Sequence, residues 1–280
     1  MSELTYRFHQ VRRPGVTRDL PFGPEDLFWV TNRATLILGP TETLLVDTFT
    51  TVEQNTELVE WIRSTGRDLT TVYITHGHGD HFFGLGQLRH AFPEARFLAR
   101  PGAIAEAQQQ GSDAYIESFW NPLFTGAIPK QGVWPEPFEA TTMEIDGIEV
   151  EVIDTGFTDT HDTSAVWVPS LRLVATGDVA YDRNHLYLAE TDRSTRANWA
   201  AAAERLAELG PAAVVTGHGA GDTAAGVEAL HSTATYLRDF DEIAATTSTA
   251  EALYRAMLER YPRWLNPGAL WGGAKRAHPL

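Results

Sequence analysis

The sequence contains no cysteine. Disulfide bonds, thiolate metal ligands and a cysteine nucleophile are therefore all excluded. With 280 residues, of which 43% are hydrophobic, the chain can bury a large core without the covalent or metal staples that small domains need. We therefore expect any metal site in this chain to serve function rather than folding.

The sequence also lacks a long apolar run. No stretch approaches the roughly 18–20 residues that a membrane span requires. The segment Met1–Gln10 is polar and has no apolar core of the kind found in signal peptides. We expect a cytoplasmic protein that has no membrane partner.

Basic residues are scarce. Lys and Arg number 22 against 37 Asp and Glu, which gives a formal net charge of −15. Such a chain repels phosphate backbones, and the pair Arg12-Arg13 is its only basic cluster of note. We therefore expect a small-molecule substrate rather than nucleic acid. Association with further copies of the chain remains open.

Alternating and apolar runs predict an α/β chain. Helices are expected at 52–64, 82–91 and 195–209, and strands at 27–31, 34–38, 43–47, 71–75, 96–99, 142–145, 148–154, 165–168, 172–176 and 213–216. The dipeptide Asp146-Gly147 is a hairpin turn signal. Asn32-Arg33 is interpreted as a turn between the first two strands.

One domain spanning 1–280 is the simplest organisation, with a core at about 27–220. Residues 101–137 look like an insertion that is helical at first and then rich in proline and aromatic residues, including Phe119 and Trp120. The aromatic residues form either a lid or pocket wall, or a surface loop that covers core. The segment from about 222 to 280 is expected to be a helical extension.

The most informative motif is the run His76-Gly77-His78-Gly79-Asp80-His81. Three imidazoles and a carboxylate are ligand types that suit zinc and similar first-row metals. The run directly follows a predicted buried strand, where α/β proteins place their sites. The two glycines are expected to let the backbone turn tightly.

Further ligand-type residues follow three later strands. His161 comes after the strand that ends near residue 154, Asp178 follows the strand 172–176, and His218 follows the strand 213–216. Asp159 and Asp162 flank His161 and are competing ligands or outer partners of the site. Four strand ends that each carry a ligand-type residue predict one converged metal centre.

This pattern resembles the metallo-β-lactamase-fold hydrolases, whose motif is His-x-His-x-Asp-His followed by a His, an Asp and a His at successive strand ends. The resemblance spans about Leu27 to Gly219 and implies an αββα sandwich. It also implies two zinc ions, with Fe or Mn as other possible metals. The implied ligands are His76, His78 and His161 for the first ion, Asp80, His81 and His218 for the second, and Asp178 between them.

Two metal ions can share a hydroxide that attacks a carbonyl, and Asp80 could hold that hydroxide and pass its proton to the leaving group. In the quorum-quenching lactonases of this superfamily, a tyrosine three residues after the bridging Asp points at the substrate carbonyl, and Tyr181 resembles it. His185, Phe119 and Trp120 are further candidates for substrate contacts. By the same resemblance, Asp47 is expected to be an outer partner of the site rather than a ligand.

The leading hypothesis is a zinc-dependent hydrolase that acts on a lactone or related ester. The alternatives are a β-lactamase-like amidase or thioester hydrolase, a mononuclear iron dioxygenase acting on persulfides, and a ligand-binding member that has lost turnover.

Overall fold

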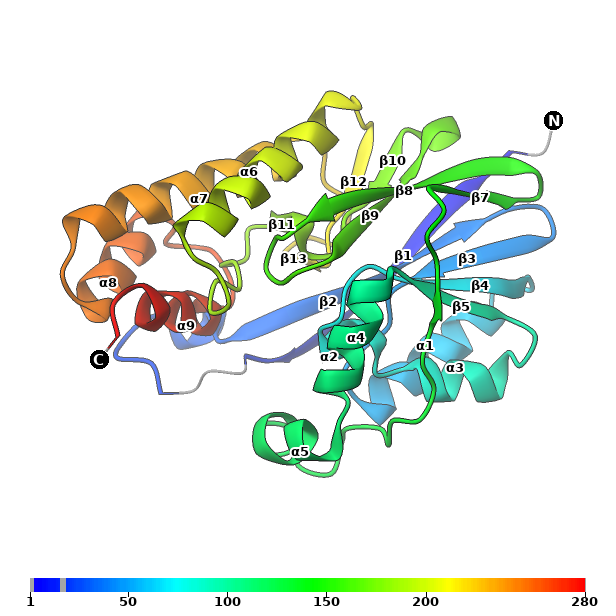
Figure 1. Ribbon diagram of the computed structural model, residues 1–280, viewed down its shortest axis with the longest axis horizontal. Coiled ribbons are helices and arrows are strands. Elements are labelled where there is room, and N and C mark those ends of the chain that lie inside the picture. The colour runs from blue at the N-terminus through cyan, green and yellow to red at the C-terminus, as the bar shows by residue number, and fades with distance from the viewer. Residues whose placement is uncertain (1–2, 16–18, 280) are drawn as a thin grey trace.

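The structure is a computed structural model that describes residues 3–15 and 19–279. Two β-sheets lie face to face, and helices cover the outer face of each sheet (Figure 1). The apolar side chains between the sheets form a core of their own, with Ile37, Leu44 and Tyr73 from the first sheet against Val150, Val166 and Leu173 from the second. The predicted αββα sandwich is confirmed.

The first sheet has the strand order β1-β2-β3-β4-β5-β6. Its strands are β1 (Thr5–Pro14), β2 (Trp29–Leu38), β3 (Glu42–Val46), β4 (Asp68–Ile74), β5 (Arg96–Ala99) and β6 (Glu136–Pro137). The first three strands pair antiparallel, while β3 to β6 run parallel. The parallel strands therefore end at the same edge of the sheet, which is where the predicted metal ligands begin.

The second sheet has the order β12-β10-β9-β8-β7. Its strands are β7 (Thr142–Ile145), β8 (Ile148–Gly156), β9 (Thr163–Val168), β10 (Leu173–Ala175) and β12 (Ala213–Val215), and a small separate pair joins β11 (Tyr181–Asp182) to β13 (His218–Gly219). The hairpin predicted at Asp146-Gly147 is present, with φ of 49° and 74°. Positive φ at both central positions is typical of the type I′ turn.

Helices on the two outer faces bury separate apolar clusters. The first sheet is covered by α1 (Val52–Arg63), α2 (Gly79–Phe82), α3 (Leu85–Ala91) and α4 (Pro101–Gln110), with α5 (Asp113–Tyr115) and the π-helix η2 (Ile116–Trp120) beyond them. The second is covered by α6 (Arg193–Glu208), α7 (Glu228–Thr246), α8 (Ala250–Arg260) and α9 (Pro267–Ala277), so the predicted C-terminal extension is helical (Figure 1). Short 3-10 turns occur at Glu25–Leu27, Pro169–Leu171 and Gly177–Val179.

The interpretation of Asn32-Arg33 as a turn is wrong. Both residues are buried in the middle of β2, which runs unbroken from Trp29 to Leu38 along β1. Their polar groups are satisfied there, because Asn32 bonds to Arg13 and Asp80 while Arg33 bonds to Gln10. Buried polar side chains with specific partners thus take positions that the sequence pattern assigns to a loop.

Of the helices in residues 3–15 and 19–279, none combines the length and apolar character that a membrane crossing requires.

Candidate metal centre

The histidine-rich run begins just after the end of β4, with Thr75 between them. His78 lies in extended conformation at the N-terminal cap of α2, and Asp80 and His81 lie in that short helix. Gly77 and Gly79 do not have positive φ. They are needed for space instead, because a Cβ at Gly77 would lie 2.4 Å from Glu106 of α4 and one at Gly79 would lie 2.4 Å from Phe83. The glycines therefore let the run pack closely against its neighbours, rather than supplying a left-handed turn.

Seven side chains from the predicted strand ends converge beside this run. Three overlapping groups have ligand atoms within 4.8 Å of one another, namely His76 with His78 and Asp159, His76 with His81 and Asp178, and Asp80 with His81 and His218. All of these side chains are buried. His76, His81 and Asp178 form the middle group and link the two ends, so the seven side chains make one continuous cluster.

Each histidine turns one ring nitrogen toward an outer partner. Nδ1 of His76 lies 3.0 Å from the Thr75 hydroxyl and Nδ1 of His81 lies 3.0 Å from Asp47, while Nδ1 of His218 contacts the Thr31 carbonyl. His78 is turned the other way, with Nε2 lying 3.2 Å from Glu190. Such contacts fix the ring orientation and tautomer of metal-binding histidines. The remaining nitrogens, Nδ1 of His78 and Nε2 of the other three, face the interior of the cluster. Nε2 of His218 lies 3.0 Å from Oδ2 of Asp178 there, and Nδ1 of His78 lies 2.9 Å from Oδ2 of Asp159.

The carboxylates are held in the same manner. Oδ1 of Asp159 accepts a 2.8 Å hydrogen bond from the Thr158 hydroxyl, and Oδ2 of Asp178 accepts one of 2.5 Å from Tyr181. Oδ2 of Asp80 accepts from Arg13 at 2.6 Å and from Asn32 at 2.9 Å. Every one of the seven side chains is therefore oriented by a residue outside the cluster.

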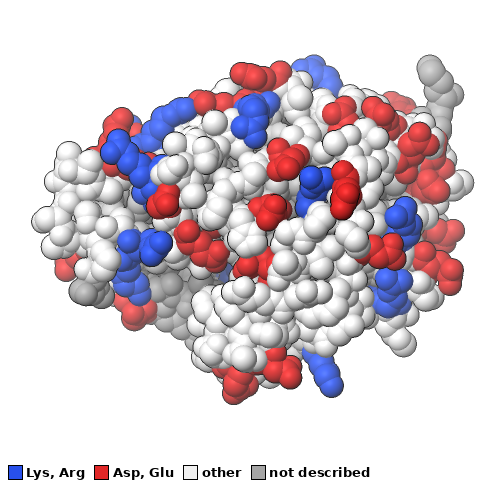
Figure 2. All heavy atoms as spheres, viewed as in Figure 1, with Lys and Arg blue, Asp and Glu red and all other residues white. Residues whose placement is uncertain are grey.

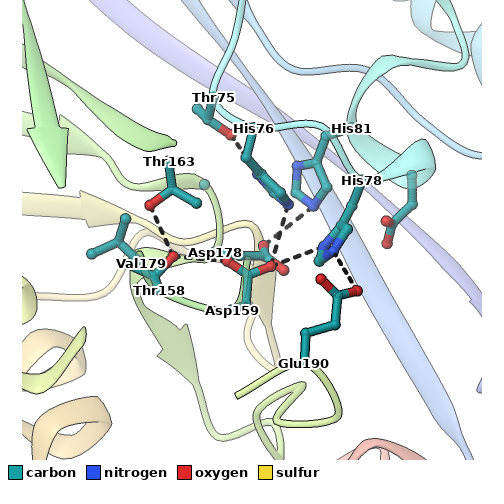
Figure 3. Close-up of polar contacts among 12 residues, drawn as sticks. Thr75, His76, His78, His81, Thr158, Asp159, Thr163, Asp178, Val179 and Glu190 are labelled. Carbon is teal, nitrogen blue, oxygen red and sulfur yellow. Dashed lines mark hydrogen bonds and ion pairs between the residues drawn. The ribbon is translucent and has the colours of Figure 1, made fainter. Parts of the chain in front are cut away.

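Several inward-facing atoms lack a hydrogen bond. Among the described residues, Nε2 of His76, Nε2 of His81, Oδ2 of Asp159 and Oδ1 of Asp178 are buried and have no hydrogen-bond partner. Buried polar atoms are rarely left unpaired, and each one costs free energy. Figure 3 shows the imidazoles of His76, His78 and His81 directed toward Asp159 and Asp178. Nε2 of His76 lies 3.5 Å from Oδ2 of Asp159, and Nε2 of His81 lies 3.2 Å from Oδ1 of Asp178. Imidazole nitrogens and carboxylate oxygens that approach one another without hydrogen bonds fit a divalent metal site.

The pKa shifts in the cluster arise from burial and from charge pairing between its imidazoles and carboxylates. Burial opposes ionisation of Asp178, but His218 and His81 hold its pKa well below the ordinary value. Burial likewise opposes the charged form of His78, yet Asp159 and Glu190 raise its pKa well above the ordinary value. For Asp80, Arg13 outweighs burial and lowers the pKa. His76 and His78 likewise outweigh burial and lower the pKa of Asp159. The three buried carboxylates are therefore held in the charged form, which attracts cations.

The structure confirms the prediction that Asp47 is an outer partner of the cluster. It follows β3 with a left-handed φ of 64°, which is unusual for a residue with a side chain. Its Oδ1 accepts from the backbone N–H of Thr75 at 2.8 Å, while Oδ2 faces Nδ1 of His81. Strained backbone at such a position is typical of functional sites.

The structure does not bring His161 to the cluster. Its imidazole is 45% exposed and contacts Glu106 at 3.2 Å and Asp162 at 3.0 Å. The loop between β8 and β9 turns Thr158, Asp159 and Thr160 inward and leaves His161 on its outer side. Asp159, predicted only as a competing ligand, stands where His161 was expected, and this corrects the sequence prediction.

His185 is not a pocket residue. It is fully buried, and its Nδ1 lies 2.9 Å from the Tyr236 hydroxyl of α7. Burial lowers the pKa of His185 to about 3. Its predicted substrate contact is therefore wrong, and its side chain belongs to the aromatic core around Tyr236 and Trp264.

A pocket opens directly onto the cluster. Tyr181, Phe119 and Trp120, the predicted substrate contacts, line it together with Arg13, His78, Asp80, Gln110, Tyr115, Asp178, Tyr187, His218, Asn266 and Ala269. Trp120 is buried against Phe83 as well, so the aromatic insertion both walls the pocket and covers core. The C-terminal extension contributes Asn266 and Ala269, a role that no sequence signal indicated.

Comparisons with known proteins agree with this geometry. Residues 28–218 match the family model described as the metallo-beta-lactamase superfamily. The chain belongs to the metallo-beta-lactamase superfamily. The matched segment begins just before β2 and ends on His218, so it contains the whole candidate metal cluster.

Solved structures of this superfamily share the fold. A metallo-beta-lactamase family protein from Thermus thermophilus superposes with a TM-score of 0.65 at 20% identity, covering 97% of this chain and 91% of that one. A metallo-beta-lactamase from Pontibacter korlensis gives 0.64 at 19% identity, covering 85% and 100%. One from Erythrobacter litoralis gives 0.59 at 18%, covering 84% and 92%. The comparison with curated proteins finds no match.

Proposed function

We propose that this protein is a metal-dependent hydrolase that cleaves a lactone or related ester of a small organic molecule. The observation that carries the proposal is the buried cluster of four imidazoles and three carboxylates, all oriented from outside. Its chemistry fits two divalent first-row cations, with zinc as the first choice because its usual ligands include both imidazole and carboxylate. The superfamily consists largely of hydrolytic metalloenzymes, which supports the reaction class.

Two divalent cations at such a site would lower the pKa of a shared water molecule and polarise a carbonyl group. His76, His78 and Asp159 would hold one, His81, His218 and Asp80 the other, and Asp178 would lie between them. Tyr181 borders the same pocket, and its hydroxyl donates to Asp178. From this position it can hold Asp178 in place and face a bound substrate.

Asp80 serves better as a ligand than as a proton carrier. Arg13 and Asn32 both donate to its Oδ2, and the same oxygen lies 3.9 Å from Nε2 of His218 in the cluster. The guanidinium charge also stabilises the ionised carboxylate, so Asp80 does not readily take up a proton. The proton transfer that the sequence suggested for Asp80 is therefore not part of the proposed mechanism.

The pocket favours an uncharged substrate. Aromatic rings from Tyr115, Phe119 and Tyr187 form much of its wall, and Arg13 is the only described Lys or Arg that lines it. Because Arg13 is already paired with Asp80, the described pocket lining offers no other Lys or Arg to bind a substrate carboxylate. β-Lactam antibiotics carry such a carboxylate, so we place a lactone or ester ahead of a β-lactam.

Surface charge agrees with a small-molecule partner. In the face that Figure 2 shows, basic side chains lie singly or in small groups among acidic ones, without a continuous basic stripe. Phosphate backbones are bound through such stripes. We therefore keep nucleic acid outside the proposal.

The test is an assay of metal-loaded protein on four neutral or charged substrates: an acyl lactone, a p-nitrophenyl ester, a thioester and a chromogenic β-lactam. We expect turnover of the lactone or ester, abolition of that turnover in His78→Ala, and its retention in the matched variant His161→Ala. Turnover that survives in His78→Ala would refute the metal mechanism. Turnover of the β-lactam alone would move the proposal to an amidase, and turnover of none would favour a ligand-binding member.

A mononuclear iron oxygenase is the second candidate. It is favoured by the group His76-His78-Asp159, because two histidines and one carboxylate are the usual ligand set of non-haem iron(II) oxygenases. Oxygen consumption in the presence of a persulfide, with one iron per chain, would support this candidate and overturn the dinuclear one.

A further inference from the structure

Asp159 gives the cluster an additional carboxylate. Its Oδ2 lies 2.9 Å from Nδ1 of His78 and 3.5 Å from Nε2 of His76. Asp159 thus occupies the position beside these two histidines at which a third histidine, His161, was expected. The side chain is fully buried and its Oδ2 has no hydrogen-bond partner among the described residues. An ionisable group is buried in this way only when charge or metal compensates it.

The loop around Asp159 is built to hold that carboxylate inward. Thr158 donates to Oδ1 of Asp159, and the Thr158 hydroxyl lies 2.9 Å from that of Thr163 at the start of β9 (Figure 3). The Thr163 hydroxyl in turn lies 2.8 Å from that of Thr155 in β8. This chain of hydroxyls ties the loop to both strands, so Asp159 has one oxygen fixed and the other directed at the cluster.

With Asp159 in place, the two halves of the cluster have the same composition. His76, His78 and Asp159 form the first half-site, and the second half-site consists of His81, His218 and Asp80. Each half-site has two imidazoles and one carboxylate of its own, and they share Asp178. Neither half-site has three imidazoles.

We infer that Asp159 shifts the metal preference of the first half-site from Zn²⁺ toward Mn²⁺ or Fe²⁺. Carboxylate oxygens suit Mn²⁺, imidazoles suit Zn²⁺, and two histidines with one carboxylate suit Fe²⁺. Replacing an imidazole by a carboxylate also adds a negative charge, which lowers the Lewis acidity that a bound cation presents to water. The inference rests on the proposed dinuclear site, but it concerns binding selectivity and does not depend on which substrate is cleaved.

The test is the ratio of the Mn²⁺ and Zn²⁺ dissociation constants, measured on metal-free protein by competition with a chelating indicator. In Asp159→His, we expect Zn²⁺ to gain on Mn²⁺ by about tenfold or more relative to the unsubstituted chain. Asp159→Asn keeps the shape and removes the charge, and in this variant we expect Mn²⁺ affinity to fall more than Zn²⁺ affinity. Circular dichroism tests whether each variant is folded. The conclusion is drawn from the variants that fold.

His161→Asn is the matched control, since it alters the neighbouring residue that lies outside the cluster. We expect its affinities for both metals to equal those of the unsubstituted chain. An unchanged Mn²⁺ to Zn²⁺ ratio in the folded Asp159 variants, or a loss of metal in His161→Asn, would overturn the inference. Absence of lactone or ester turnover with normal metal binding would refute the proposed function and leave the inference standing.

Discussion

The guanidinium group of Arg13 donates a 2.6 Å hydrogen bond to Oδ2 of Asp80, across a sequence separation of 67 residues. Arg13 lies near the end of β1, and Asn32 on the neighbouring strand β2 donates to the same oxygen. The first two strands thus place the Arg13 guanidinium and the Asn32 amide against Asp80 of the histidine-rich run. This arrangement holds the Asp80 carboxylate beside His218 of the metal cluster.

Loss of the Arg13 charge should therefore weaken the second half-site. In Arg13→Gln we expect the second metal ion to bind about 10–100-fold more weakly, the usual cost of removing an outer partner of a metal ligand. Arg13→Lys should recover part of the loss, because it restores the charge without the planar guanidinium. Metal content per chain and hydrolysis rate measure both effects. Arg12→Gln is the matched control, since Arg12 stacks on Trp29 and lies outside the cluster, and equal losses in the two variants would contradict the role given to Arg13.

Tyr181 supports a prediction about rate. Tyr181→Phe removes the hydroxyl that donates to Asp178 and borders the pocket. We expect hydrolysis to fall by about 10–100-fold, and the metal content to show whether the loss arises through Asp178 or through the substrate. Tyr254→Phe removes a hydroxyl that bonds to the Phe22 carbonyl far along the chain, and it should keep the full rate. A Tyr181→Phe enzyme as fast as the unsubstituted one would exclude both roles.

Ligand-type residues at strand ends were predictable because regular strands bring the residues at their ends to a common edge. His76 and Asp178 come shortly after β4 and β10, His218 begins β13, and the structure brings all three together. The loop from Gly156 to Thr163 is irregular, so the choice between Asp159 and His161 depends on which side chain turns inward. That orientation depends on the hydroxyl contacts of Thr158, which no periodicity reveals.

Partners from distant segments were not predictable for a different reason. Arg13 is part of the only basic pair singled out in the sequence, but its role depends on the pairing of β1 with β2, which brings its guanidinium group to Asp80. Glu190 lies in the segment before α6 and carries no motif, although it orients His78. Such contacts exist only once the sandwich has formed, so the local sequence does not encode a recognisable signal for them.

His185 gives a prediction about stability and pH. Its pKa is lowered from 6.5 to about 3 by burial, so the folded chain keeps it neutral where the unfolded chain protonates it. The unfolded state therefore binds more protons between about pH 3 and 6.5, and His185 lowers stability progressively as the pH falls through that window. Its share of the slope is about 1.4 kcal/mol per pH unit.

The measurement is the free energy of unfolding from pH 7 to pH 4, compared between the unsubstituted chain and His185→Asn. Asparagine does not titrate, and its carbonyl can still accept from the Tyr236 hydroxyl. We expect the variant to show a smaller loss of stability with acidification. Parallel curves for the two proteins would mean that His185 is not kept neutral by the fold.

Metal removal should lower the unfolding temperature. Without cations, the carboxylates of Asp80, Asp159 and Asp178 lie close together in a buried site. A ligand that binds only the folded state stabilises it, and tight binding of two ions corresponds to a shift of about 10 °C for a chain of this size. Thermal unfolding with and without a chelator measures the shift, and re-addition of metal should reverse it. Identical midpoints in both buffers would mean that the cluster does not hold metal tightly.

The number of metal ions per chain tests the dinuclear site most directly. Elemental analysis of purified protein, paired with anomalous scattering from crystals, should find two divalent ions per chain, bound among His76, His78, His81, His218 and the three aspartates. His78→Ala should reduce the count, whereas His161→Ala should leave it at two. One iron per chain, or a count that falls in His161→Ala and not in His78→Ala, would contradict the account.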